Sequence, residues 1–281
     1  MIGATVLAGL FAVYAVFASR LDRMWITAPM VFVFAGALFG RYGLDWVHEP
    51  LSGEPVRSVT ELTLALLLFA DASTISLHEV EVDGGVPTRL LLLGLPLTMV
   101  LGTLVGMALF PSAGWAAMAL IAVILAPTDA ALGLAVVTNP VVPVRVRRVL
   151  NVESGLNDGI ATPFVTWLLA LVVADESAGH SSWALHAFEE IGLAILAAVA
   201  VGIGGGRLIA WTRRRGWTSA TSEQLAVLAL AFLSYEGALA IGGNGFVAAF
   251  ASGILFGATT RHTFHEATEF TETLAMFSSF L

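Results

Sequence analysis

The chain has no cysteine, no lysine and few charges of either sign. The absence of cysteine among its 281 residues excludes disulfides and thiolate metal sites. Only 12% of the residues are charged, against about 25% in soluble domains. Hydrophobic residues make up 57%, and the mean hydropathy is +0.86. The formal net charge of −8 argues against a nucleic-acid partner. This composition predicts an all-α polytopic membrane protein that lies in a lipid bilayer.

Apolar runs follow one another along the whole chain. A helix needs about 20 residues to cross about 30 Å of hydrocarbon. The first run has no basic segment before it, so we interpret it as a retained span rather than a cleaved signal. We expect one transmembrane domain over residues 1–281 with about ten spans. The spans are Ile2–Ala18, Trp25–Phe39, Val59–Thr74, Leu90–Phe110 (interrupted by Pro96), Ala116–Val137 (interrupted by Pro127), Val152–Val173, Ala187–Trp211, Glu223–Ile241, Phe246–Ala258 and a run from Thr268 onward.

The arginines fall on alternate turns of this arrangement. Only Arg41 and Arg57 lie in turns that follow even-numbered spans, and the other eleven lie in turns that follow odd-numbered spans. Because basic residues accumulate on the cytoplasmic side, we expect the N-terminus outside and the arginine-rich loops in the cytoplasm of a cell-membrane protein. The last span is still running at Leu281, so we expect the chain to be part of a longer transporter.

The fifth span contains Pro127-Thr128-Asp129. A charged side chain at bilayer depth costs at least about 2.5–3.5 kcal/mol, so Asp129 needs a partner there. Proline breaks the helix and frees carbonyl groups, which are tolerated at this depth only inside protein or beside a wet cavity. Carbonyl, hydroxyl and carboxylate oxygens suit a hard monovalent cation. The alternative is a packing kink in which Asp129 caps the continuing helix.

The sixth span carries a second group of polar residues. Ser154 and Asp158 are four residues apart and share a helix face, with Asn157 beside them. Glu153 lies about 140° around the helix from Asp158, and we expect it to pair with a basic group on another helix. The alternative is that Asn151–Gly159 is a polar loop and the span begins later.

Two further acidic residues and two short motifs have weaker functional interpretations. Asp71 lines the same cavity or marks the membrane interface, and Glu236 is a gating acid or a helix-end charge. The stretch Gly202–Gly206 lies in an apolar helix without a βαβ context, so it predicts close helix packing rather than nucleotide binding. The stretch His262–Glu266 lacks the HExxH pattern of zinc proteases and predicts a polar turn.

Electrostatics connects these residues to exchange. Desolvation favours the neutral form of a carboxyl group, whereas a bound cation favours its ionised form. A carboxylate that accepts either a cation or a proton can exchange one for the other. This chemistry needs no cofactor, nucleotide or ATP, so we expect a transporter and not an enzyme.

The strings Pro127–Asp129 and Glu153–Gly159 resemble those of the monovalent cation/proton antiporter superfamily, and most of all its NhaP-like and NHE-like sodium/proton antiporters. The spacing from Asp129 to Asp158 agrees with that family. Phe69–Ala72, Ala226–Gly237 and Gly245–Gly253 extend the likeness. The resemblance implies inverted repeats with crossed, broken helices, a dimerisation and a core domain, and elevator-type alternating access. The first repeat would cover about 1–175 and an incomplete second repeat about 183–281.

The resemblance also assigns roles. Asp158 would carry the cation (Na⁺ or K⁺) and the proton, and Asp129, Thr128 and Ser154 would complete the ion site. Asn157 would stabilise the crossed helices, and the asparagine at this place suggests the electroneutral branch. Glu153 would pair with an arginine on a later helix, and the protein would be a homodimer. Ala130 stands where the family usually has proline, and Gly155 where leucine is commoner.

Two other functions remain open at this stage. An intramembrane aspartyl protease would use two of Asp71, Asp129 and Asp158 as a dyad, but its G-x-G-D motif is absent. A scaffold or sensor descended from an antiporter would keep the fold without transport.

Overall fold

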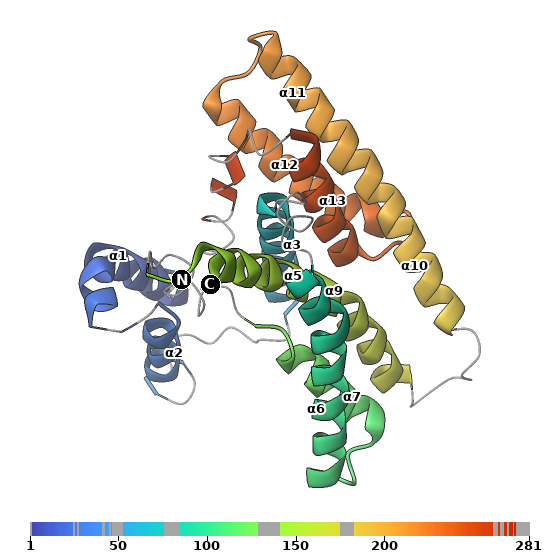
Figure 1. Cartoon of the computed structure of the whole chain (residues 1–281). Helices are drawn as coiled ribbons and strands as arrows, with labels where there is room; N and C mark the ends of the chain where they lie inside the picture. Colours follow the sequence, from blue (N-terminus) through green and yellow to red (C-terminus); the bar gives the residue numbers. More distant parts are fainter. Residues whose placement is uncertain are drawn as a thin grey trace. The chain divides into compact units, whose positions relative to one another are not determined.

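The computed structural model is mainly helical in the part of the chain that it describes, with no strand there. The described residues are 2–24, 26, 28–40, 43–44, 46, 53–75, 85–128, 141–174, 183–260, 264, 267–268, 270–271 and 273. The chain divides into two compact units, residues 1–63 together with 274–281, and residues 64–273. Both units are built from helices (Figure 1).

The first unit is built around α1 (Ile2–Arg23) and α2 (Ala28–Phe39). Phe32 of α2 packs against Phe11 and Tyr14 of α1, with ring centroids 4.7 and 5.4 Å apart. Both helices coincide with predicted spans, although α1 continues five residues beyond the apolar run. The next helix, α3 (Glu54–Thr74), begins in this unit and ends in the second.

The second unit opens with a long helix that changes its winding. It consists of α5 (Gly85–Arg89), the π-helical η1 (Leu90–Gly94) and α6 (Leu95–Leu109). The sequence predicted an interruption at Pro96, but the helix continues. Proline lacks the N–H of an α-helical bond, and the wider π turn immediately before it changes the hydrogen-bond pattern at the place where that bond would be lost.

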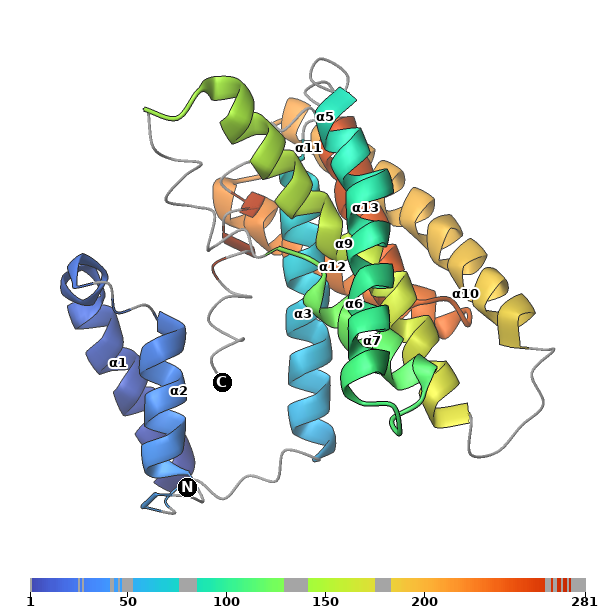
Figure 2. The same cartoon turned by 60° about the horizontal axis from the view of Figure 1, so that its bottom comes forward.

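The helix α7 (Trp115–Leu125) returns along α6, and α9 (Val144–Ala174) packs against α7 and against α5 and η1 (Figure 2). Their shared core consists of buried apolar side chains from all three helices. These are Leu95, Met99, Ala119, Val123, Ala161 and Leu168. Because α9 starts eight residues before the predicted span, Asn151–Gly159 is helical, and the polar-loop alternative is wrong.

The remaining helices follow the predicted spans closely. The segments α10 (Trp183–Ala198), η2 (Val199–Gly205) and α11 (Gly206–Arg214) form one continuous helix (Figure 1). The helices α12 (Ala220–Ala240) and α13 (Gly245–Thr260) follow.

The glycines of η2 and of the start of α11 permit the close packing that the sequence predicted. A Cβ added to Gly202 would lie 2.6 Å from the carbonyl oxygen of Ser252 on α13, and one added to Gly206 would touch Phe256 and Thr259.

The end of α3 packs on α13 within the second unit. The rings of Phe69 and Phe256 are 5.7 Å apart. A Cβ on Gly253 would collide with the carbonyl oxygen of Phe69 and would lie 2.9 Å from Cβ of Ala72. Two stretches that carry the family resemblance, Phe69–Ala72 and Gly245–Gly253, therefore pack against each other.

The helices expose apolar surface of the kind that lipid covers. Four are long and apolar enough to cross a membrane, spanning Gly85–Leu109, Val144–Val173, Glu189–Arg214 and Ala220–Ala240, and four shorter apolar helices accompany them among the described residues. On η1 and α6, Leu92, Leu93 and Leu97 are 66%, 68% and 57% exposed. Contiguous apolar exposure on this scale is typical of membrane contact. The chain is an all-α polytopic membrane protein, as its composition predicted.

Candidate ion site

The predicted break in the fifth span is confirmed. The helix α7 ends at Leu125, Ala126 still has helical dihedral angles, and Pro127 and Thr128 continue outside the helix. The expected bias of Ala126 away from helical geometry is not seen, but Pro127 has no backbone N–H to continue the hydrogen-bond ladder, so the helix end follows from the sequence. Thr128 is exposed. The predicted ligand Asp129 and the residues up to 140 lie outside the described residues.

Thr128 meets two polar side chains of α9. Its hydroxyl donates to the Glu153 carboxylate at 3.0 Å from Oε2 and 3.2 Å from Oε1. The Asn157 Nδ2 donates to Oγ1 of Thr128 at 2.8 Å and to the carbonyl oxygen of Thr128 at 3.1 Å. It also lies 3.4 Å from Oε1 of Glu153. Thr128, Glu153 and Asn157 form a closed group, which we call the Thr128 cluster.

Asn157 connects this cluster to the neighbouring carboxylate position. Its side chain is fully buried. The Oδ1 of Asn157 accepts a hydrogen bond from the backbone N–H of Asp158 at 2.6 Å. A buried carboxamide destabilises the folded protein unless its N–H donors and its oxygen acceptor have hydrogen-bond partners. Here both the Nδ2 donor and the Oδ1 acceptor of Asn157 have partners. One side chain therefore joins the broken end of α7 to the α9 backbone at Asp158.

The contact of Glu153 with Thr128 is one part of the site that sequence reasoning missed. We expected Glu153 to pair with a basic group, whereas its hydrogen bonds in the described part of the chain go to Thr128 and Asn157. The signal was the spacing: Glu153 and Asn157 are four residues apart and share a helix face. This pair is offset by one residue from Ser154 and Asp158.

The two pairs of polar residues face different directions on α9. Gly155 lies against Ile75 after α3, and Gly159 against Phe250 of α13, while Glu153 and Asn157 face the end of α7. At about 100° per residue, Ser154 and Asp158 project between these two packed faces. In that sector Asp158 is exposed and Ser154 is half-buried. The described helices thus leave the Asp158 carboxylate accessible beside a satisfied polar cluster.

C-terminal to Asp158, threonine hydroxyls form a second set of hydrogen bonds on α9 that the sequence analysis did not identify. Thr162 Oγ1 donates to the Asp158 carbonyl oxygen at 2.7 Å, one residue before Pro163 inside the helix. Thr166 Oγ1 lies 3.1 Å from the Pro163 carbonyl oxygen, and it accepts a hydrogen bond from Asn244 Nδ2 at 3.2 Å. Such threonine bonds to the preceding turn bend helices.

Asn244 also caps α13. Its Oδ1 accepts from the backbone N–H groups of Phe246 and Val247, both at 3.1 Å. An asparagine directly before an apolar periodic run is a helix-start signal, so the sequence contained this information.

The two remaining acidic candidates lie on other helices. Asp71 is half-buried near the end of α3, beside the buried Ala72. Glu236 is exposed on α12, four residues before that helix ends at Ala240. This position agrees with the interpretation of Glu236 as a helix-end charge.

Comparison with known families agrees with this geometry. The family model described as sodium/hydrogen exchanger, transmembrane, matches residues 6–281. Proteins of this kind are transporters and not enzymes, which favours cation/proton exchange over the protease alternative. The match includes the broken end of α7, the polar stretch of α9 and the α3–α13 contact. The chain is a member of the sodium/hydrogen exchanger family of transmembrane proteins.

Proposed function

We propose that this chain exchanges a monovalent cation, Na⁺ or K⁺, for protons across the cell membrane, with the Asp158 carboxylate carrying both ions in turn. Ser154, Thr128 and Asp129 complete the ion site in this proposal. Asn157, Glu153 and Asp71 support it. The movement is of the elevator type, in a homodimer with its N-terminus outside.

The observation that carries the proposal is the position of Asp158. It is exposed between two packed faces of α9, and its backbone N–H is bound by the fully buried Asn157. The same asparagine binds the backbone of Thr128 after the helix break. The carboxylate is therefore accessible to an ion, while the helix that bears it is fixed against the end of α7.

Competition for one carboxylate explains coupling. The ionised form of Asp158 is costly at membrane depth unless a cation or a proton neutralises it. Because an empty, charged site crosses poorly, each crossing takes place with one ion or the other bound. The hydroxyl of Ser154, one helical turn from Asp158, provides a neutral oxygen that coordinates a cation without adding charge.

Proteoliposomes test the proposal directly. The purified chain is reconstituted in vesicles that hold a pH-sensitive dye and are acidified inside, and Na⁺, K⁺ or choline is then added outside. We expect Na⁺ or K⁺, but not choline, to dissipate the pH gradient. Asp158→Asn keeps the size of the side chain and removes the titrating charge, so we expect this variant to lose cation-driven proton movement.

The matched control is Glu190→Gln, which also converts an acid into its amide but on the exposed surface of α10. It should exchange at the wild-type rate. Normal exchange by a folded Asp158→Asn variant would contradict the assignment of that carboxylate. A folded wild-type chain that exchanges neither cation would favour the scaffold or sensor alternative. The homodimer is tested separately by the mass of the detergent-solubilised protein.

A further inference from the structure

The turn between α11 and α12 gathers basic and aromatic residues at the end of a membrane span. Four of the thirteen arginines of the chain lie within residues 207–215. The apolar helix that ends there, Glu189–Arg214, has 26 residues, or roughly 39 Å at about 1.5 Å per residue. It is longer than about 30 Å of hydrocarbon, and the next span starts at Ala220. A helix of this length that spans the bilayer would place this turn at the level of the lipid headgroups.

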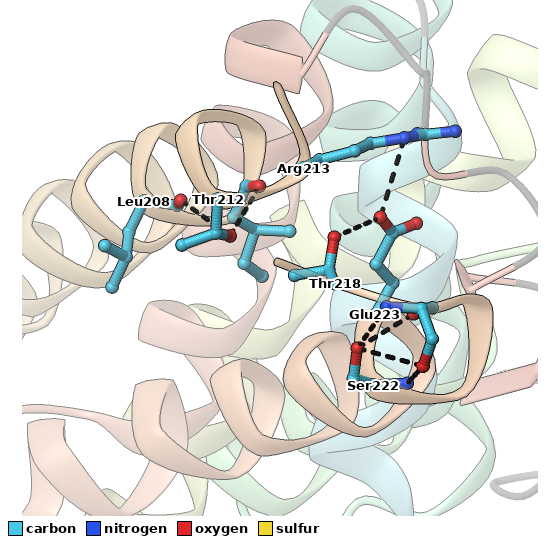
Figure 3. A network of polar contacts seen from close by, with 8 residues as sticks. Leu208, Thr212, Arg213, Thr218, Ser222 and Glu223 are labelled. Atoms are coloured by element: carbon cyan, nitrogen blue, oxygen red, sulfur yellow. Dashed lines mark hydrogen bonds and ion pairs between the residues drawn. The ribbon is translucent and has the colours of Figure 1, made fainter. Parts of the chain in front are cut away.

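One arginine of the turn forms an ion pair with a carboxylate of the same chain. Arg213 Nε lies 3.5 Å from Oε1 of Glu223, which also accepts a hydrogen bond from Thr218 at 2.8 Å (Figure 3). The guanidinium of Arg213 also lies 4.8 Å from the centre of the buried Phe264 ring. Glu223 is the only acidic residue between 206 and 223, so the single carboxylate of this stretch is already engaged by Arg213.

A second arginine is oriented by two tryptophans. The guanidinium of Arg215 lies 4.6 Å from the Trp211 ring centre and 5.5 Å from that of Trp217. The two indoles contact each other edge to face at 5.1 Å. Trp217 is 64% exposed and Trp211 is 39% exposed. Cation–π contact restrains the planar guanidinium without neutralising its charge, and exposed tryptophans prefer the membrane interface.

We propose that the α11–α12 turn binds the headgroup of an anionic phospholipid. Arg214 and Arg215, both exposed, supply the positive charge, and Trp211 and Trp217 contact the region where the headgroup meets the acyl chain. Charge complementarity favours this occupant, because the local carboxylate is held by Arg213 and the guanidinium fork matches a phosphate group. The site is independent of the proposed exchange and lies on a different pair of helices.

Lipid binding by the whole chain tests this site. The purified protein in neutral detergent micelles is titrated with phosphatidylglycerol or with phosphatidylcholine of the same acyl chains, and bound lipid is counted by native mass spectrometry. We expect tighter binding of phosphatidylglycerol, weakened by raising NaCl from 0.1 to 1 M, since the screening length falls from about 10 to about 3 Å. Arg215→Gln should raise the dissociation constant about fivefold, because a basic residue near an anionic surface contributes about 1 kcal/mol.

The matched control is Arg89→Gln, because Arg89 ends α5 and is exposed but belongs to a different helix. It should leave phosphatidylglycerol binding unchanged. Arg215→Lys retains the charge without the planar fork, and it should bind with intermediate affinity; this variant decides the question if Arg215→Gln does not fold. Equal binding of the two lipids, or equal losses in Arg215→Gln and Arg89→Gln, would overturn the proposal. Displacement of the lipid by millimolar inorganic phosphate would identify a soluble-anion site instead.

Discussion

The bond between Asn157 and Thr128 should couple the stabilities of two helices in a measurable way. Asn157→Ala removes the hydrogen bonds to the carbonyl and hydroxyl oxygens of Thr128, and the one from the Asp158 N–H. Three partly buried groups lose a partner, and each one that water does not reach costs about 1–3 kcal/mol. We therefore expect Asn157→Ala to lower the free energy of unfolding by about 2–4 kcal/mol. Thr128→Val keeps the shape of the side chain and removes only the hydroxyl, so it should cost less.

The double variant separates the shared bond from these individual losses. Hydrogen bonds between membrane helices contribute about 0.6 kcal/mol on average and at most about 1.7. The two substitutions should therefore be non-additive by an amount in this range. Unfolding by sodium dodecyl sulfate in mixed micelles, followed by tryptophan fluorescence, measures the free energy of unfolding of the wild type, both single variants and the double variant. Thr128→Ser is the control, because it keeps the hydroxyl and should retain the coupling with Asn157. Additivity within about 0.3–0.5 kcal/mol, which is usual for independent sites, would refute the proposed connection.

Two further predictions concern the packing of α13. Gly202→Ala should lower the melting temperature, because its Cβ would lie 2.6 Å from the Ser252 backbone oxygen, and overpacking costs about 1–3 kcal/mol. Gly204→Ala has open space around its Cβ, so it should leave the melting temperature unchanged or raise it; equal effects of both variants would show that the contact is not tight. Asn244→Ala should lose about 1 kcal/mol for the helix cap and the bond to Thr166 as well. Asn244→Asp keeps the capping oxygen and should lose only the hydrogen bond to Thr166. Equal melting temperatures of Asn244→Ala and Asn244→Asp would therefore argue against a capping role.

Hydropathy predicted where helices exist but not how far they extend. The predicted span starting at Val152 became the later part of α9, which begins at Val144. The basic stretch at its start is too polar to count toward a bilayer span, yet it continues the same hydrogen-bond ladder. At Pro96, by contrast, the sequence predicted an interruption where the structure has a continuous helix. Sequence rules treat proline as a break, whereas the π turn of η1 accommodates it within one helix.

The site was predicted in its residues more fully than in its contacts. The Pro127 break, and Asp158 beside Asn157 on a helix, followed from local rules on proline, charge and spacing. The contact of Glu153 with Thr128 did not, because it depends on how α7 ends against α9. Tertiary packing sets this contact, and no periodicity in the sequence reports it.

The contacts around α9 also differ in how soon a growing chain can make them. Thr128 is only 25 residues from Glu153 and 29 from Asn157. By contrast, the bond from Ser73 at the end of α3 to Thr268 joins residues 195 apart. At about 5–20 residues per second, the ribosome needs roughly 10–40 s to add that length. The polar cluster can therefore close early in synthesis, while the buried face of α3 waits in the membrane for the last helices to arrive.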